Sequence, residues 1–134
     1  MLKLTHTDLL TLEAYARERD AFRARALAHK APRKVHLGAH VTLVFEDRLT
    51  IQYQVQEMLR VERIFEPAGI AEELERSTDT KTAAVHFLRF ELDAAQIATW
   101  RAGAPIMLAT DHPAYAAKTT LDAVTREALA RDFD

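Results

Sequence analysis

Apolar residues between Arg48 and Glu66 recur with the spacing of an α-helix and fill an unusually wide sector of it. At about 100° per residue they cover roughly two thirds of the circumference, and they are Tyr53, Ile64, Val61, Phe65, Met58, Ile51 and Val55. A helix at the surface of a globular protein has a narrower apolar stripe, so this pattern predicts a central and largely buried helix. Pro67 and Gly69 follow it and are expected to end it.

Helical spacing also occurs near both ends of the chain. The segment from Thr5 to His29 indicates two short helices, because Asp20 can cap the second and place a bend at Arg17–Arg19. Shorter helices are predicted further along the chain, at Ile70–Arg76, Ala94–Ala102 and Leu121–Phe133.

Period-two alternation predicts the strands. Apolar residues alternate on both sides of Gly38, which indicates a hairpin between Lys34 and Phe45. Residues Ala83–Leu92 are rich in β-branched and aromatic side chains, and Ile106–Ala109 is a third apolar strand candidate followed by a loop at Asp111–Pro113. The elements together predict an α+β fold: a small, mainly antiparallel sheet with a long central helix and shorter helices packed on one face.

Composition places the chain among ordinary globular proteins. Its 134 residues suit a single domain spanning 1–134, and its apolar content of 49% can supply one core. The formal net charge of −2 argues against nucleic acid as a partner. The absence of cysteine excludes thiol chemistry and cysteine-held metal sites. We see no signal peptide and no membrane-spanning run, so we expect a soluble cytoplasmic protein with no membrane partner.

Three polar side chains project from inside the apolar arc of the central helix: Gln54, Glu57 and Glu62. A buried carboxylate needs a partner, whether a cation, a network of hydrogen-bond donors or a metal ion. His86 alternates with apolar residues on its strand, and Arg89 faces the other way, where it could pair with a helix carboxylate. We therefore predict a polar pocket beside the central helix, lined by Gln54, Glu57, Glu62, His86 and Arg89.

Histidines supply candidate metal ligands. His40 shares a strand face with Glu46, and His112 follows Asp111, which could orient its imidazole. A divalent transition metal is accordingly a candidate cofactor, with His40, Glu57, His86 and His112 as its ligands. The alternatives are surface histidines, a satisfied core histidine at position 86, and a loop cap by Asp111.

Four segments of the chain carry a family resemblance: LEAYARERDAFRARALAHK (12–30), FEDRLTIQYQVQEMLRVERIFEPAGI (45–70), TAAVHFLRFEL (82–92) and DHPAY (111–115). They resemble the bacterial family catalogued as domain of unknown function 3501. The resemblance brings no established activity, but members are often encoded near rubrerythrin-like and iron–sulfur oxidoreductase genes, which implies a role in redox or peroxide physiology. Similar members carry several tens of extra residues between the positions matching Leu74 and Glu75. This chain therefore resembles a short form that lacks a central segment, either because the natural protein lacks it or because the segment is missing from the sequence.

Three functions remain open at this point. The leading hypothesis is a non-catalytic accessory or binding protein in redox or metal physiology, with a redox protein or a second copy of the chain as its partner. The first alternative is a metal-dependent or acid–base enzyme that uses the same glutamate and histidine residues. The second is a structural dimerisation module, in which the polar strip of Gln52, Gln56 and Arg60 forms a symmetric contact; a solvated helix face explains the same strip.

Overall fold

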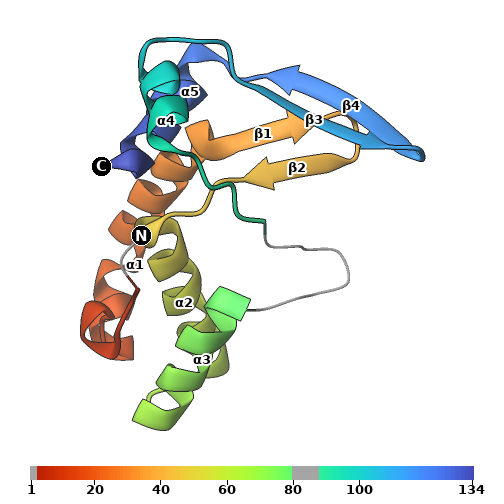
Figure 1. Ribbon diagram of the computed structural model, residues 1–134. Coiled ribbons are helices and arrows are strands. Elements are labelled where there is room, and N and C mark those ends of the chain that lie inside the picture. The colour runs from red at the N-terminus through yellow and green to blue at the C-terminus, as the bar shows by residue number, and fades with distance from the viewer. Residues whose placement is uncertain (1–2, 80–87) are drawn as a thin grey trace. The chain divides into compact units, whose positions relative to one another are not determined.

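The computed structural model describes residues 3–79 and 88–134, which belong to two compact units (Figure 1). Unit 1 comprises Met1–His29 and Glu46–Arg89, and unit 2 comprises Lys30–Phe45 and Phe90–Asp134. Each unit is described by itself below. The prediction that residues 1–134 form one domain stays a prediction.

Unit 1 is helical. A 3-10 turn, η1 (His6–Asp8), precedes three helices, which are α1 (Leu12–Lys30, whose last residue belongs to unit 2), α2 (Arg48–Glu62) and α3 (Pro67–Asp79). The predicted bend in the first helical segment is wrong, because α1 runs unbroken for 19 residues. Tyr15, Phe22 and Ala26 lie on one buried stripe of α1, so a single straight helix covers them without a break at Arg17–Arg19.

The central helix α2 begins where the sequence predicts and ends earlier. Asp47 caps its N-terminus by accepting a hydrogen bond from the Thr50 backbone N–H at 3.1 Å. The helix ends at Glu62 because Arg63 adopts a left-handed conformation, with φ 54°. Pro67 does not stop α2; it is the first residue of α3, a position that suits proline because the first helical N–H needs no partner within the helix.

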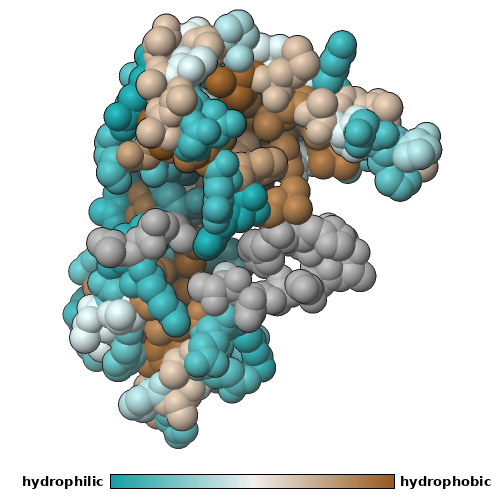
Figure 2. Space-filling view, viewed as in Figure 1, coloured by the Kyte–Doolittle hydropathy of each residue, from teal (hydrophilic) through white to brown (hydrophobic). Residues whose placement is uncertain are grey.

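Because α2 ends early, only part of the predicted apolar arc is buried. Val55 and Leu59 are buried with Ile70 of α3, and Ile51 and Ile64 pack against them. Val61 and Phe65, which the same arc predicts to be buried, are exposed instead. The face of the protein shown in Figure 2 carries both apolar and hydrophilic residues.

Unit 2 is built on two antiparallel hairpins. The first pairs β1 (Lys34–Leu37) with β2 (Val41–Val44), as the alternation around Gly38 predicts. The second pairs β3 (Met107–His112) with β4 (Tyr115–Thr120), and each hairpin forms its own two-stranded sheet. The remaining elements of unit 2 are η2 (Ala31–Arg33), α4 (Ala94–Arg101), α5 (Ala123–Ala130) and η3 (Arg131–Phe133).

The strand predictions need three corrections. Asp111 and His112 lie in β3 rather than in a loop, and β4 was not predicted because its sequence, YAAKTT, lacks a strong apolar alternation. The described part of the strand predicted at Ala83–Leu92, residues 88–92, forms no strand; residues 83–87 lie outside the described residues.

The core of unit 2 is formed by Val35, Leu121 and Leu129, with partly buried residues packed against them, including Trp100 and Leu108. The α+β class with antiparallel pairing is therefore confirmed. Within the described residues, no helix combines the length and the apolar character that crossing a bilayer requires.

Candidate functional site

The Glu57 carboxylate lies at the centre of a polar network in unit 1. The Tyr15 hydroxyl donates to its Oε1 at 2.7 Å, and Arg19 donates from Nε to Oε1 at 2.8 Å and from Nη2 to Oε2 at 3.1 Å. Arg60 donates to Oε2 at 3.2 Å. The side chain of Glu57 is 20% exposed. Both carboxylate oxygens are therefore engaged, by two guanidinium groups and a hydroxyl; we call Tyr15, Arg19, Glu57 and Arg60 the Glu57 network.

The network fixes the protonation of its members. Hydrogen bonds from Arg19, and then from Tyr15 and Arg60, outweigh the effect of burial and lower the pKa of Glu57 to about 2. Burial, together with the hydrogen bond to Glu57, raises the pKa of Tyr15, so the hydroxyl keeps its proton and remains a donor. Glu57 consequently stays ionised near neutral pH. Its predicted need for a partner is met by cations from the chain itself.

The other predicted pocket residues lie elsewhere. Gln54 and Glu62 are exposed, so the expectation that they project into the interior with Glu57 is wrong. Arg89 is also exposed, and His86 lies outside the described residues.

Gln56 is a buried polar residue that was predicted to face solvent. Its side chain is fully buried, accepts from the Leu10 N–H at 2.6 Å and donates to the Leu10 carbonyl at 3.3 Å. Gln52 donates to the carbonyl of Asp8 at 2.8 Å. Two members of the predicted dimer strip therefore bind the N-terminal segment of their own chain. Gln56 lies three residues before the buried Leu59, on the same face of α2, and that spacing could have signalled its burial.

Two of the predicted metal ligands, His40 and His112, are exposed and belong to unit 2, whereas Glu57 belongs to unit 1. The Tyr115 hydroxyl accepts from the His40 N–H at 3.1 Å and donates to the Leu37 carbonyl at 2.5 Å. His112 pairs with Tyr115 across the second hairpin, and its Nδ1 accepts from the Ala114 N–H at 3.0 Å. The structure thus brings both histidines beside Tyr115. Among the described residues, no group of three or more potential ligands has the arrangement to hold a metal ion.

Unit 1 contains a second covered carboxylate, Glu73 of α3, which the sequence analysis missed. Ile70, Glu73 and Ser77 are buried at spacings of three and four residues, so they form one face of α3. Burial, and then the nearby charge of Glu62, raises the pKa of Glu73. The spacing of Ile70, Glu73 and Ser77 could have indicated this buried face. The prediction missed it because α3 contains five charged residues, which make the helix look polar on every side.

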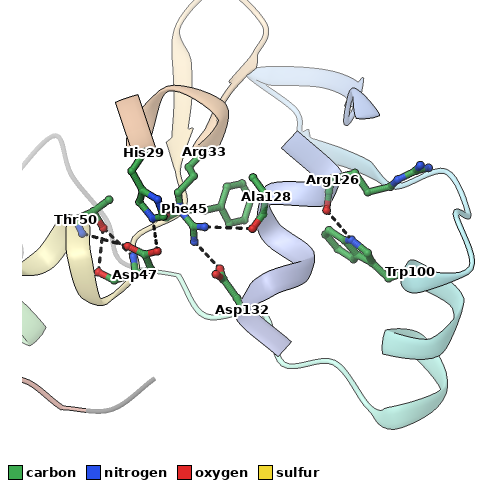
Figure 3. Close-up of polar contacts among 9 residues, drawn as sticks. All are labelled: His29, Arg33, Phe45, Asp47, Thr50, Trp100, Arg126, Ala128 and Asp132. Atoms are coloured by element: carbon green, nitrogen blue, oxygen red, sulfur yellow. Dashed lines mark hydrogen bonds and ion pairs between the residues drawn. The ribbon is translucent and has the colours of Figure 1, made fainter. Parts of the chain in front are cut away.

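Two further polar clusters have structural roles (Figure 3). In unit 1, His29 Nε2 contacts Asp47 Oδ2 at 2.5 Å, beside the cap of α2. In unit 2, the buried guanidinium of Arg33 donates to the Phe45 carbonyl at 2.7 Å and to Asp132 Oδ2 at 2.5 Å. Both clusters hold chain segments together through charged hydrogen bonds.

Comparison with known proteins matches the chain to a family and to solved structures. A family model described as "Protein of unknown function (DUF3501)" matches residues 3–77 and 72–133. A crystal structure of a novel protein of unknown function from Burkholderia pseudomallei K96243 is 34% identical, with a TM-score of 0.91, and the match covers 99% of this chain and 100% of that one. No curated protein is similar enough to count as a match. The two family segments overlap within α3, near the predicted loss between Leu74 and Glu75, and the short form stays a prediction.

Proposed function

Because the chain belongs to the DUF3501 family, whose function is unknown, we propose from its own residues that it is a non-catalytic, cytoplasmic accessory protein that binds a partner protein in redox or metal physiology. The observation that carries this proposal is a pair of exposed apolar side chains, Val61 at 64% and Phe65 at 72% exposure, within five residues of chain. We call them the apolar pair. Large apolar side chains that gather at the surface are typical of protein interaction sites.

Acidic residues surround the apolar pair along the chain. Glu62 and Glu66 each adjoin one member of the pair, and the exposed Glu72 and Glu75 follow in α3, while Arg60 and Arg63 are the nearby basic residues. The basic residues of this stretch are fewer, and Arg76 is paired with Glu72 at 2.5 Å. A partner that fits would present an apolar side chain with basic residues beside it, because complementary charge speeds association and excludes wrong partners.

The same charges favour a different protein over a second copy of the chain. In a symmetric dimer each surface meets itself, so the acidic residues around the apolar pair would face acidic residues. Two side chains of the predicted dimer strip, Gln52 and Gln56, are also bound to the chain's own N-terminal segment. The family's association with redox genes points to an iron–sulfur oxidoreductase or a rubrerythrin-like protein as the partner.

The Glu57 network argues against the acid–base enzyme alternative. A general acid or base works best with a pKa near the operating pH. The pKa of Glu57 is about 2, and both of its oxygens already accept hydrogen bonds. A carboxylate held in this way stabilises the fold and does not exchange protons near neutral pH.

Direct binding measurements test the proposal. An iron–sulfur oxidoreductase of the class associated with the family is immobilised, and binding of the wild-type chain is compared with Phe65→Ser and with Val124→Ser. Val124 is the matched control because it is 66% exposed and lies in unit 2. We expect Phe65→Ser to weaken the Kd about tenfold or more, as loss of an aromatic anchor does, and Val124→Ser to bind like the wild type. Equal loss in both variants, or no binding by the wild type, would overturn the proposal.

The metal part of the proposal rests on His40 and His112 beside Tyr115. Elemental analysis of protein purified without a histidine tag tests it. About one iron, zinc or manganese ion per chain, lost in His112→Ala, would support a metal role. Metal-free protein would end that part of the proposal and leave the protein-binding part standing.

A further inference from the structure

One face of α3 carries a charged residue among buried ones. Glu73 is 6% exposed and lies between Ile70 and Ser77, which are buried on the same face. The Ser77 hydroxyl donates to the Leu74 carbonyl at 2.9 Å, so its hydrogen bond is made within the helix. The Glu73 carboxylate has no hydrogen bond and no ion pair with any residue in the described part of the chain. It therefore differs from Glu57, which is partly exposed and fully paired.

The charges around Glu73 do not neutralise it. α2 and η1 pack against α3, and α2 contributes Glu62, which has the same charge. On α3 itself, Arg76, which is paired with Glu72 at 2.5 Å, lowers the pKa of Glu73, but by less than burial and Glu62 raise it, and Glu72 raises it further. In η1, Asp8 is bound by Thr5 and Arg48, and His6 is exposed. An ionised Glu73 is thus covered by protein and repelled by Glu62, whereas a protonated Glu73 incurs neither penalty.

We propose that Glu73 is a proton-controlled latch, which holds α3 against α2 when it is protonated and loosens that packing when it is ionised. The latch needs no partner and no metal ion. It is independent of the proposed function, because Glu73 acts on the packing of α3 whichever protein binds the apolar pair.

The direction of the pH effect follows from the raised pKa of Glu73. Docked α3 binds a proton more tightly than released α3, in which the carboxyl returns to its ordinary value of 4.5. Docking is therefore strongest below that ordinary value, and it weakens as pH rises toward the raised pKa. Within this window each pH unit changes the opening equilibrium by at most about tenfold.

Loosening of α3 would uncover apolar surface. Ile70 packs with Val55 and Leu59 of α2, and Leu74 packs against the same cluster. These side chains become accessible when α3 moves away. The latch thereby makes the exposure of an apolar helix face depend on protonation of one carboxyl group.

Amide hydrogen exchange across about pH 4 to about pH 8 tests the latch, with rates corrected for the intrinsic pH dependence of exchange. In the wild type, protection of the α3 amides should fall within the window, by at most about tenfold per pH unit, while the α1 amides change little. Glu73→Gln should keep α3 protected at every pH. Glu66→Gln is the matched control: it removes the same charge from an exposed position just before α3 and should behave like the wild type.

A second variant keeps the test informative if Glu73→Gln does not fold. Glu62→Gln removes the neighbouring like charge and leaves Glu73 in place, so the pH at which α3 loosens should change. With the repulsion gone, the pKa of Glu73 in docked α3 falls toward its ordinary value, so the loosening ends at lower pH and is smaller in extent. The latch is refuted if protection of α3 is independent of pH in the wild type, or if Glu73→Gln loosens over the same pH range as the wild type.

Discussion

Replacing Glu57 by glutamine should cost a large share of the protein's stability near neutral pH. The substitution keeps the size of the side chain and removes the charge to which Arg19 and Arg60 are paired. The network lowers the pKa of Glu57 from its ordinary 4.5 to about 2. A shift of one pKa unit corresponds to about 1.4 kcal/mol, so the ionised carboxylate contributes about 3 kcal/mol to the free energy of unfolding.

The sign of the pH dependence follows from the lowered pKa. The unfolded chain binds the proton more tightly than the folded one, so the stabilisation is complete above pH 4.5 and is lost as pH falls toward about 2. Urea unfolding of the wild type and of Glu57→Gln, at about pH 7 and at about pH 3, measures the difference. We expect the wild type to be more stable by about 3 kcal/mol at the higher pH, and this difference to fall to about 1 kcal/mol at the lower one, which is about one pH unit above the pKa of folded Glu57.

Glu13 provides a matched control. It pairs with Arg17 on the surface of α1, with its side chain 86% exposed, and a surface pair of this kind contributes little. Glu13→Gln should therefore unfold like the wild type at both pH values. The reasoning would be refuted if Glu57→Gln lost the same amount of stability at both pH values, or if it lost no more than Glu13→Gln.

Three further substitutions test how the units are built. Gly38→Ala should destabilise unit 2 by about 2 kcal/mol, because φ is 73° there and a Cβ would collide with the Tyr115 hydroxyl; thermal unfolding measures the loss, and a variant as stable as the wild type contradicts it. Gln56→Leu should cost about 2 kcal/mol by leaving the N–H and carbonyl of Leu10 without their partner, and hydrogen exchange at Leu10 should accelerate if this explanation is correct. Arg33→Met should cost about 3 kcal/mol, because a buried, hydrogen-bonded guanidinium is lost; unchanged urea unfolding would show that its contacts contribute little.

The sequence pointed to Glu57 correctly and could not identify its partners. A carboxylate inside an apolar arc signals burial, because side chains three and four residues apart share a face of the helix. Which residues meet it depends on how α1 packs against α2, and that information does not lie within either helix alone. Tyr15 and Arg19, one turn apart on α1, both reach Glu57. The sequence placed Arg19 at a bend instead.

The other errors have a similar cause. Gln56 was assigned to a solvated strip because glutamine is usually exposed, but the backbone of Leu10 gives it both a donor and an acceptor. Glu73 was hidden among charged neighbours in α3. The strand β4 was missed because its outward positions carry alanine, lysine and threonine, and its pairing with β3 supplies the stability that its own sequence does not indicate.

Glu57 and Glu73 make the stability of unit 1 depend on pH in opposite directions. Below pH 4.5, stability rises with pH because Glu57 becomes ionised between two arginines. Above that value, the hold on α3 weakens because Glu73 must ionise beside Glu62. Two carboxylates of the same helical unit therefore respond to protons in opposite directions, since one is surrounded by cations and the other by protein and a like charge. The difference explains why removing the charge of Glu57 should destabilise the unit, whereas removing the charge of Glu73 should keep α3 docked at every pH.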